Sequence, residues 1–179
     1  MHFQKILGIF LIAALPVFSF AETKHEIDAK VDSALVRFHK EVNVADELLA
    51  KSAAVLVLPE VIKGGFIVGG EYGEGALLVN GKPTVYYNVA SASFGLTLGG
   101  EMKDFVILFF STDALKQFRE RKGWEAGVDG NIAVWKKGKG VSADVTRIND
   151  DPMVAFVVGV KGILVDASLR GSKFSVIKD

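Results

Sequence analysis

Residues 64–100 of the chain read GGFIVGGEYGEGALLVNGKPTVYYNVASASFGLTLGG, and this stretch decides the expected fold. It holds ten of the nineteen glycines of the chain, interleaved with apolar and aromatic residues. Glycine permits turns and close approach of two backbones, whereas Val, Ile, Tyr and Phe suit a pleated surface. We therefore expect tightly turned β-structure here.

A period of two continues through VYYNVASASFGLTL, residues 85–98. One face of this expected strand carries Val85, Tyr87, Val89, Ser91 and Ser93, and the other carries Tyr86, Asn88, Ala90, Ala92, Phe94, Leu96 and Leu98. Because successive side chains of a strand point to opposite faces, only one set can line a given core. We expect the second set to do so.

Outside this stretch the sequence predicts helices and one fully buried strand. Apolar residues recur at steps of three and four from His25 to about Ser52, which predicts an amphipathic helix or, with Asn43 as a cap, a helix pair. The segment FVILFF, residues 105–110, is apolar throughout and suits a strand covered on both faces. A short helix is expected to begin at Ser111 or Thr112.

These elements predict an α+β fold. It consists of an N-terminal amphipathic helix or helix pair and a short central helix, packed on a strongly bent antiparallel sheet or partial β-barrel. Residues 22–179 are long enough to form it as a single domain.

The first 21 residues are typical of a secretory signal peptide. Lys5 precedes an apolar run from Ile6 to Val17, and Ser19-Phe20-Ala21 provides a cleavage site after Ala21. The run is shorter than the roughly 20 residues that span a bilayer. We therefore expect an exported protein of the periplasm or of a membrane face of the envelope.

Composition excludes several classes of function. The chain has no cysteine, so it has neither disulfides nor thiolate metal sites. Lys and Arg number 21 and Asp and Glu number 21, so no global charge attracts nucleic acid. Two histidines, His25 and His39, follow the signal and supply neither a zinc site nor a base for a serine nucleophile. We expect no catalytic residues, no cofactor and no metal.

Three carboxylates, Glu71, Glu74 and Glu101, lie in apolar glycine-rich sequence. A buried pair among them with separated pKa values is the pattern that a hydrolase uses for acid and base work. The simpler expectation is that all three point outward from half-exposed strands.

Two features of the sequence suit a binding partner. Basic residues lie in glycine turns, where they form a candidate site for a lipid headgroup: Lys136, Lys137, Lys139, Arg170 and Lys173. The N-terminal helix carries a candidate apolar face for lipid or membrane contact: Ile27, Val31, Leu35 and Phe38. The alternatives are solvated turns for the first feature and simple packing on the sheet for the second.

Four segments, in order, carry a family resemblance: AKSAAVLVLPEVIKGGFIVGGEYGEGALLV, YYNVASASFGLTLGGEMKDFVILFFSTDALKQF, GWEAGVDGNIAV and PMVAFVVGVKGILVDASLRGSKF. Together they resemble the SYLF domain, a lipid-binding family also found in yeast actin-patch proteins, from about Leu48 to Ile177. The resemblance implies a phospholipid-binding module, with phosphoinositides as ligands in eukaryotic members and actin association in some. It implies no catalytic residues.

The expected function is therefore non-catalytic binding of phospholipid, or of a membrane surface, in the periplasm or envelope. Actin binding is not expected, because an exported domain does not meet actin. The alternative is an envelope protein–protein interaction or scaffold module, and a hydrolase that uses the carboxylates is a third hypothesis.

Overall fold

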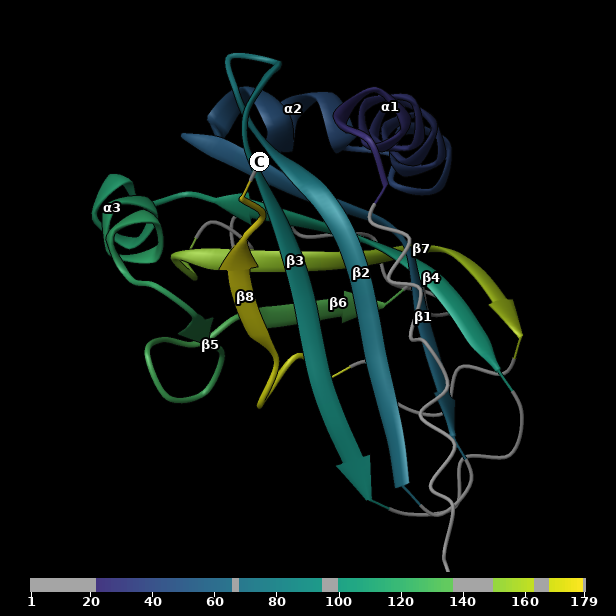
Figure 1. Cartoon of the computed structure of the whole chain (residues 1–179). Coiled ribbons are helices and arrows are strands. Elements are labelled where there is room, and N and C mark those ends of the chain that lie inside the picture. Colours follow the sequence, from purple (N-terminus) through teal and green to yellow (C-terminus); the bar gives the residue numbers. More distant parts are fainter. Residues whose placement is uncertain (1–21, 66–67, 95–99, 137–149, 163–167, 179) are drawn as a thin grey trace, which may run out of the picture.

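The computed structural model describes residues 22–65, 68–94, 100–136, 150–162 and 168–178, so the expected signal peptide lies outside the described residues. The helices and strands follow in chain order (Figure 1): α1 (Lys24–Glu41), α2 (Ala45–Lys51), β1 (Ala54–Gly65), β2 (Val68–Val79), β3 (Lys82–Phe94), β4 (Glu101–Phe109), α3 (Thr112–Glu120), β5 (Trp124–Glu125), β6 (Ala133–Lys136), β7 (Met153–Gly162) and β8 (Lys173–Val176).

The strands form one curled, open sheet in the order β5-β8-β3-β2-β1-β4-β7-β6. The pairs are antiparallel except β6 with β7, which is parallel. In Figure 1, α1 and α2 lie together over one face of the sheet, and α3 lies apart from them near β5. The predicted α+β class with a strongly bent sheet is confirmed.

Two hydrophobic clusters pack on the two faces of the sheet. The outer face, which α1 and α2 cover, buries Val57 and Val106 beneath Val31 and Phe38. The inner face, which the curl encloses, draws on α3 and on all eight strands, with Phe118 at its aromatic centre. Strand β4 contributes to both clusters in alternation, which confirms the prediction that FVILFF is covered on both faces.

The predicted helices are present, with one difference in capping. Thr23 begins α1 with a capping box that includes Glu26, and Ser111 caps α3 by accepting a hydrogen bond from the Ala114 amide at 3.2 Å. The predicted cap at Asn43 is wrong: Val44 occupies that position and makes no side-chain cap. The two turns of α2 are therefore stabilised by packing and not by a cap, since Leu48 is fully buried.

The expected core face of β3 is also wrong. Tyr87 and Val89 are buried in the inner cluster, whereas Ala90 is exposed. Tyr86 faces α1 and donates a hydrogen bond to Asp28 at 2.9 Å. The set that includes Tyr87 and Val89 is buried because the curl of the sheet and α3 enclose it. The set that includes Tyr86 and Ala90 is covered by α1 only at its Tyr86 end.

The sheet bends at two β-bulges that flank Asp104 of β4. The β1–β4 register shifts between Leu58 and Val61, and the β4–β7 register shifts between Met102 and Asp104. Glu60 in the first bulge has φ of 51°, and Gly159 in the second has φ of 62°. A Cβ at Gly159 would lie 2.5 Å from Oδ2 of Asp104, so this bulge requires glycine.

Asp104 joins both bulges to α1. Its Oδ1 accepts a hydrogen bond from the Glu60 amide at 2.9 Å, and its Oδ2 accepts one from Nε of Arg37 at 2.6 Å. The Asp104 side chain is only 3% exposed, so water does not solvate this carboxylate. The two donors replace the hydrogen bonds that it would otherwise make to water.

Three other residues of α1 and its start contact the sheet along the same line. Lys30 pairs with Glu60 at 3.0 Å, the Glu22 amide donates to Glu74 at 3.2 Å, and Glu41 accepts from the Gly159 amide at 3.1 Å. We call this polar line the α1 seam: Glu22–Glu74, Lys30–Glu60, Arg37–Asp104 and Glu41–Gly159.

Replacing Asp104 with alanine should lower the free energy of unfolding by about 3 kcal/mol, because Arg37 and the Glu60 amide lose a buried acceptor. Denaturant unfolding measures the change. The control is Glu120→Ala, which removes an exposed pair with Lys116 at 3.9 Å and should change stability by less than about 0.5 kcal/mol. Equal effects of the two substitutions would show that the bulges hold without Asp104.

Candidate functional site

The predicted headgroup residues lie on two strands near opposite ends of the strand order. Lys136 is exposed at the end of β6, and Lys173 is exposed at the start of β8. Arg170 is exposed in the turn before β8. Lys137 and Lys139 lie outside the described residues.

The curl of the sheet brings the start of β6 and the turn before β8 to one small cavity. It has a volume of about 150 Å³ and is lined by eight residues: Ala126, Gly127, Asn131, Ile132, Val134, Ser168, Leu169 and Arg170. The lining combines apolar side chains with an amide, a hydroxyl and one guanidinium. Arg170 thus lies where the two ends of the curled sheet approach each other.

Two glycines position the basic pair Arg170 and Lys173. A Cβ at Gly127 would lie 2.8 Å from Cγ of Arg170, and a Cβ at Gly123 would overlap Cε of Lys173. The two aliphatic stems therefore lie over bare backbone while both side chains remain exposed. Glu125 faces Lys173 across the β5–β8 ladder, so the region holds two cations and one carboxylate.

The predicted apolar contact face of the N-terminal helix is packed on the sheet. Ile27 and Val31 are 1% exposed, Phe38 is 0% exposed, and Leu35 packs against the same outer cluster. The arrangement matches the alternative that such a stripe covers the sheet. Contact of these four side chains with lipid would require α1 to leave it.

The expectation that all three glutamates point outward is wrong for Glu71 and Glu101. Both face inward and are buried, with 7% and 6% of their surfaces exposed. Glu74 lies on the opposite face of β2, where it accepts a hydrogen bond from the Tyr72 hydroxyl at 2.7 Å. Alternation along β2 therefore separates Glu74 from the other two.

Lys103 lies between the two buried carboxylates and is itself 1% exposed. Its Nζ is 2.7 Å from Oε2 of Glu71 and 2.5 Å from Oε1 of Glu101, and it lies 5.3 Å from the ring centroid of Phe105. Sequence reasoning missed Lys103, although its spacing of two from Glu101 places both on one face of a strand. A cation shared by two acceptors is typical of a compensated structural cluster.

Tyr72 is the outward neighbour of Glu71 in β2 and is 49% exposed. Partial burial and the hydrogen bond to Glu74 raise the pKa of Tyr72 to about 12. This tyrosine therefore stays neutral as a hydrogen-bond donor up to strongly alkaline pH.

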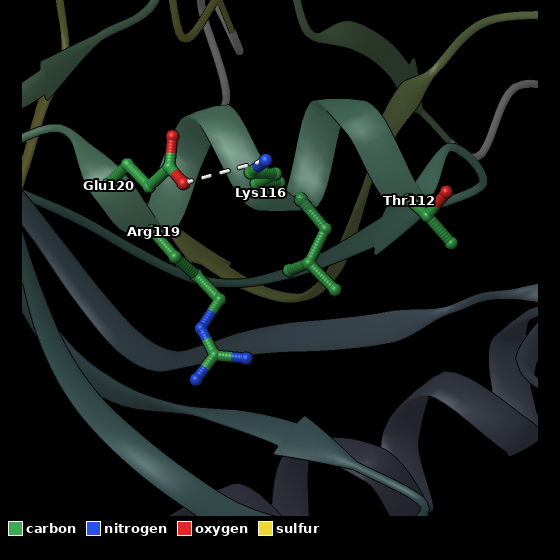
Figure 2. Close-up of a pocket in the computed structure, with 5 residues that line it drawn as sticks. Thr112, Lys116, Arg119 and Glu120 are labelled. Carbon is green, nitrogen blue, oxygen red and sulfur yellow. Dashed lines mark ion pairs between the residues drawn. The ribbon is translucent and has the colours of Figure 1, made fainter.

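Two further hollows lie on the surface. One, of about 280 Å³, is lined by α3 residues; Figure 2 shows Lys116 paired with Glu120 along the helix, while Arg119 extends away from it. The other, of about 430 Å³, lies between α1, α2 and the β1–β2 end, where Leu35, Leu49 and Leu78 meet Asp32 and Asn80. Neither contains a predicted headgroup residue.

Two searches of the described residues were negative. Within residues 22–65, 68–94, 100–136, 150–162 and 168–178, no three His, Asp or Glu side chains are grouped as a metal site. In those same ranges no helix has the length and apolarity needed to span a membrane.

Comparison with known proteins gives one family and two relatives. The sequence profile of the family Ysc84, described as "Las17-binding protein actin regulator", matches residues 90–179. Beta cell expansion factor A of Aeromonas veronii is 29% identical over 160 residues, which are 88% of this chain and 59% of that protein. LAS seventeen-binding protein 3 of Saccharomyces cerevisiae is 29% identical over 164 residues, 85% of this chain and 35% of that protein. The chain thus spans less than two thirds of either relative.

Substituting Lys103 with methionine should lower the free energy of unfolding by roughly 3–5 kcal/mol, because two buried carboxylates lose their shared cation. Adding Glu71→Gln and Glu101→Gln to the same protein should restore part of the loss, since neutral amides need no counter-charge. Chemical denaturation of the single and triple variants provides the comparison. If the triple variant loses as much stability as the single variant, the loss arises from the packing of Lys103 against Phe105 and not from the unpaired carboxylates.

The pKa of Tyr72 should fall toward 10 in Glu74→Gln, because the carboxylate that favours the neutral phenol is removed. A pKa raised in the folded state stabilises the protein below pH about 10, and this contribution is lost as pH rises through about 12. Ring resonances in an NMR titration report the pKa directly. The control is Asn88→Asp, which adds a carboxylate opposite Glu74 on the neighbouring strand. This variant should not lower the pKa of Tyr72.

Proposed function

We propose, because this chain belongs to the Ysc84 family of SYLF-domain proteins, that it is a non-catalytic phospholipid-binding protein of the cell envelope. The proposal gives it phospholipid or a membrane surface as its partner and assigns no residue a catalytic role. The predicted signal peptide supports an exported location, in the periplasm or at a membrane face.

The observation that carries the proposal is the exposed Arg170 in the lining of the 150 Å³ cavity, with the exposed Lys173 three residues further along the chain. A guanidinium matches the geometry of phosphate oxygens, and a nearby ammonium adds a second positive charge. Apolar lining from Ile132 and Leu169 suits the glycerol and upper acyl region beneath a headgroup. Lys136 at the end of β6 belongs to the proposed basic set, together with Lys137 and Lys139, which follow it in the sequence.

The buried glutamates do not favour the hydrolase hypothesis. Glu71 and Glu101 share the ammonium of Lys103, and Glu74 is on the other face of the strand. Both buried carboxylates are thus bound to the same ammonium, which is a structural role for them.

A protein partner is the second candidate function. The yeast relative is named for binding another protein, LAS seventeen, which supports an envelope interaction module as an alternative. We do not extend the actin role to this chain, because an exported protein does not meet actin.

Co-sedimentation of the purified protein with vesicles should show binding to phosphatidylglycerol-containing vesicles that weakens as salt is added. Substituting Arg170 and Lys173 with serine should reduce this binding about thirtyfold and flatten its salt dependence, since each cation near an anionic surface contributes about 1 kcal/mol. Neutralising Lys136, Lys137 and Lys139 together tests the β6 side in the same assay.

Lys116→Ser is the matched control, since Lys116 is exposed on α3 and its side chain is 71% accessible. It should bind like the unaltered protein. Failure of the unaltered protein to bind any vesicle, combined with capture of one defined envelope protein, would replace the lipid proposal with the interaction module.

A further inference from the structure

Beyond α1, the outer face of the sheet carries a row of side chains that no helix within the described residues covers. Cross-strand pairing places six residues side by side on β8, β3, β2, β1, β4 and β7: Lys173, Ala90, Tyr72, Ile62, Met102 and Lys161. We call this row the outer strip. Its middle is apolar, with a lysine on each side of it, and beyond Lys173 the same row continues to Glu125 of β5.

The strip is exposed although its centre is apolar. Ile62 is 56% exposed and Tyr72 is 49% exposed, which places both among the few large apolar side chains that face solvent. Ala90 is exposed and Met102 is half-buried. Exposed apolar residues gathered in one row, and not scattered, are typical of a contact surface.

The surroundings of the strip differ on its two sides. Toward the end of the sheet, the next row on the same face has only small residues: Ala92, Gly70 and Gly64. Toward the helix lies the α1 seam, where Glu60 pairs with Lys30 and Asp104 pairs with Arg37. Two rows on one face are about 7 Å apart along a strand, so Glu60 and Asp104 are set back from the strip, whereas Glu74 accepts a hydrogen bond from the Tyr72 hydroxyl.

We infer that the outer strip is the surface that rests on an anionic phospholipid bilayer. The inference deepens the proposed function and rests on it: it identifies which face of the protein meets the membrane. Charge complementarity favours this occupant, because Lys173 and Lys161, on the two sides of the apolar middle, match anionic headgroups.

The chemistry of each position suits the interfacial region of a bilayer. Lysine places its aliphatic stem along apolar surface and its ammonium in water, so Lys161 and Lys173 reach phosphates on either side. Tyrosine, with an apolar ring and a polar hydroxyl, prefers the level of the headgroups. Ile62 and Met102 lie between them to enter the acyl boundary.

The length of the strip separates its two lysines enough for them to reach different headgroups. Five strand spacings of about 4.8 Å separate the lysine-bearing strands, so the two Cα atoms lie about 24 Å apart along the curved sheet. In the described row beyond the strip, Ala92, Gly70 and Gly64 are small, so these three positions do not keep the strip away from a surface. Lys173 belongs to both the strip and the basic pair with Arg170.

The absence of cysteine from the chain permits an exact test of orientation. An environment-sensitive fluorophore is attached to the cysteine of the Ile62→Cys or the Tyr72→Cys variant. The control is the Val36→Cys variant, because Val36 lies on α1 and is 68% exposed. Vesicles contain either phosphatidylcholine with phosphatidylglycerol or phosphatidylcholine alone. Emission from the Ile62 and Tyr72 positions should shift to the blue with anionic vesicles, and emission from the Val36 position should not.

A charge substitution provides the second measurement. Ile62→Asp should weaken binding to anionic vesicles at least about tenfold, because it places a carboxylate in the apolar contact. Val36→Asp, with the same charge change at an exposed apolar residue, should leave binding unchanged. Both positions are exposed, and thermal unfolding checks that both variants fold.

The outcomes separate this inference from the proposed function. Vesicle binding with a blue shift at Val36 and none at Ile62 overturns the inference and leaves the function standing. A change in self-association or protein capture by Ile62→Asp, with vesicle binding intact, assigns the strip to a protein contact and also overturns it. No binding to any vesicle ends both.

Discussion

The carboxylate of Asp104 is the contact on which the bend of the sheet and the position of α1 both depend. It lies between the bulges of β1 and β7, accepts from the Glu60 amide in one and contacts Gly159 in the other, and pairs with Arg37 of the helix. A buried carboxylate requires donors to replace water, so these elements hold one another in register. The α1 seam follows from that arrangement and leaves the sheet beyond it uncovered.

The same strands use charge in opposite ways on their two faces. Glu71 points inward to Lys103 while Tyr72 points outward, and Met102 points outward between inward Glu101 and Lys103. Inner charges compensate one another inside the curl. On the outer face, Tyr72, Ile62 and Met102 form a neutral stretch between Lys173 and Lys161.

Much of the architecture was predictable from local pattern. The helical stripe that includes Ile27 and Phe38, the buried strand FVILFF and the Ser111 cap were each correctly placed, because period and capping depend on neighbours in the chain. The face of β3 that lines the core was not, since both faces carry apolar residues and only distant elements decide which is enclosed. The headgroup residues remain a prediction: Arg170 lines a cavity, and Lys173 lies over Gly123.

The sequence by itself determined the class of the fold, the amphipathic helix and the membership of a family, since these are written in periodicity and in ordered motifs. Only the tertiary structure decided the burial of Glu71 and Glu101 on Lys103, the packing of the helix face against the sheet, and the alignment of Tyr72, Ile62 and Met102 in one exposed row. Strand register brings together residues that are far apart in the chain, and the bulges around Asp104 set that register. No local pattern encodes which residues will become neighbours across six strands.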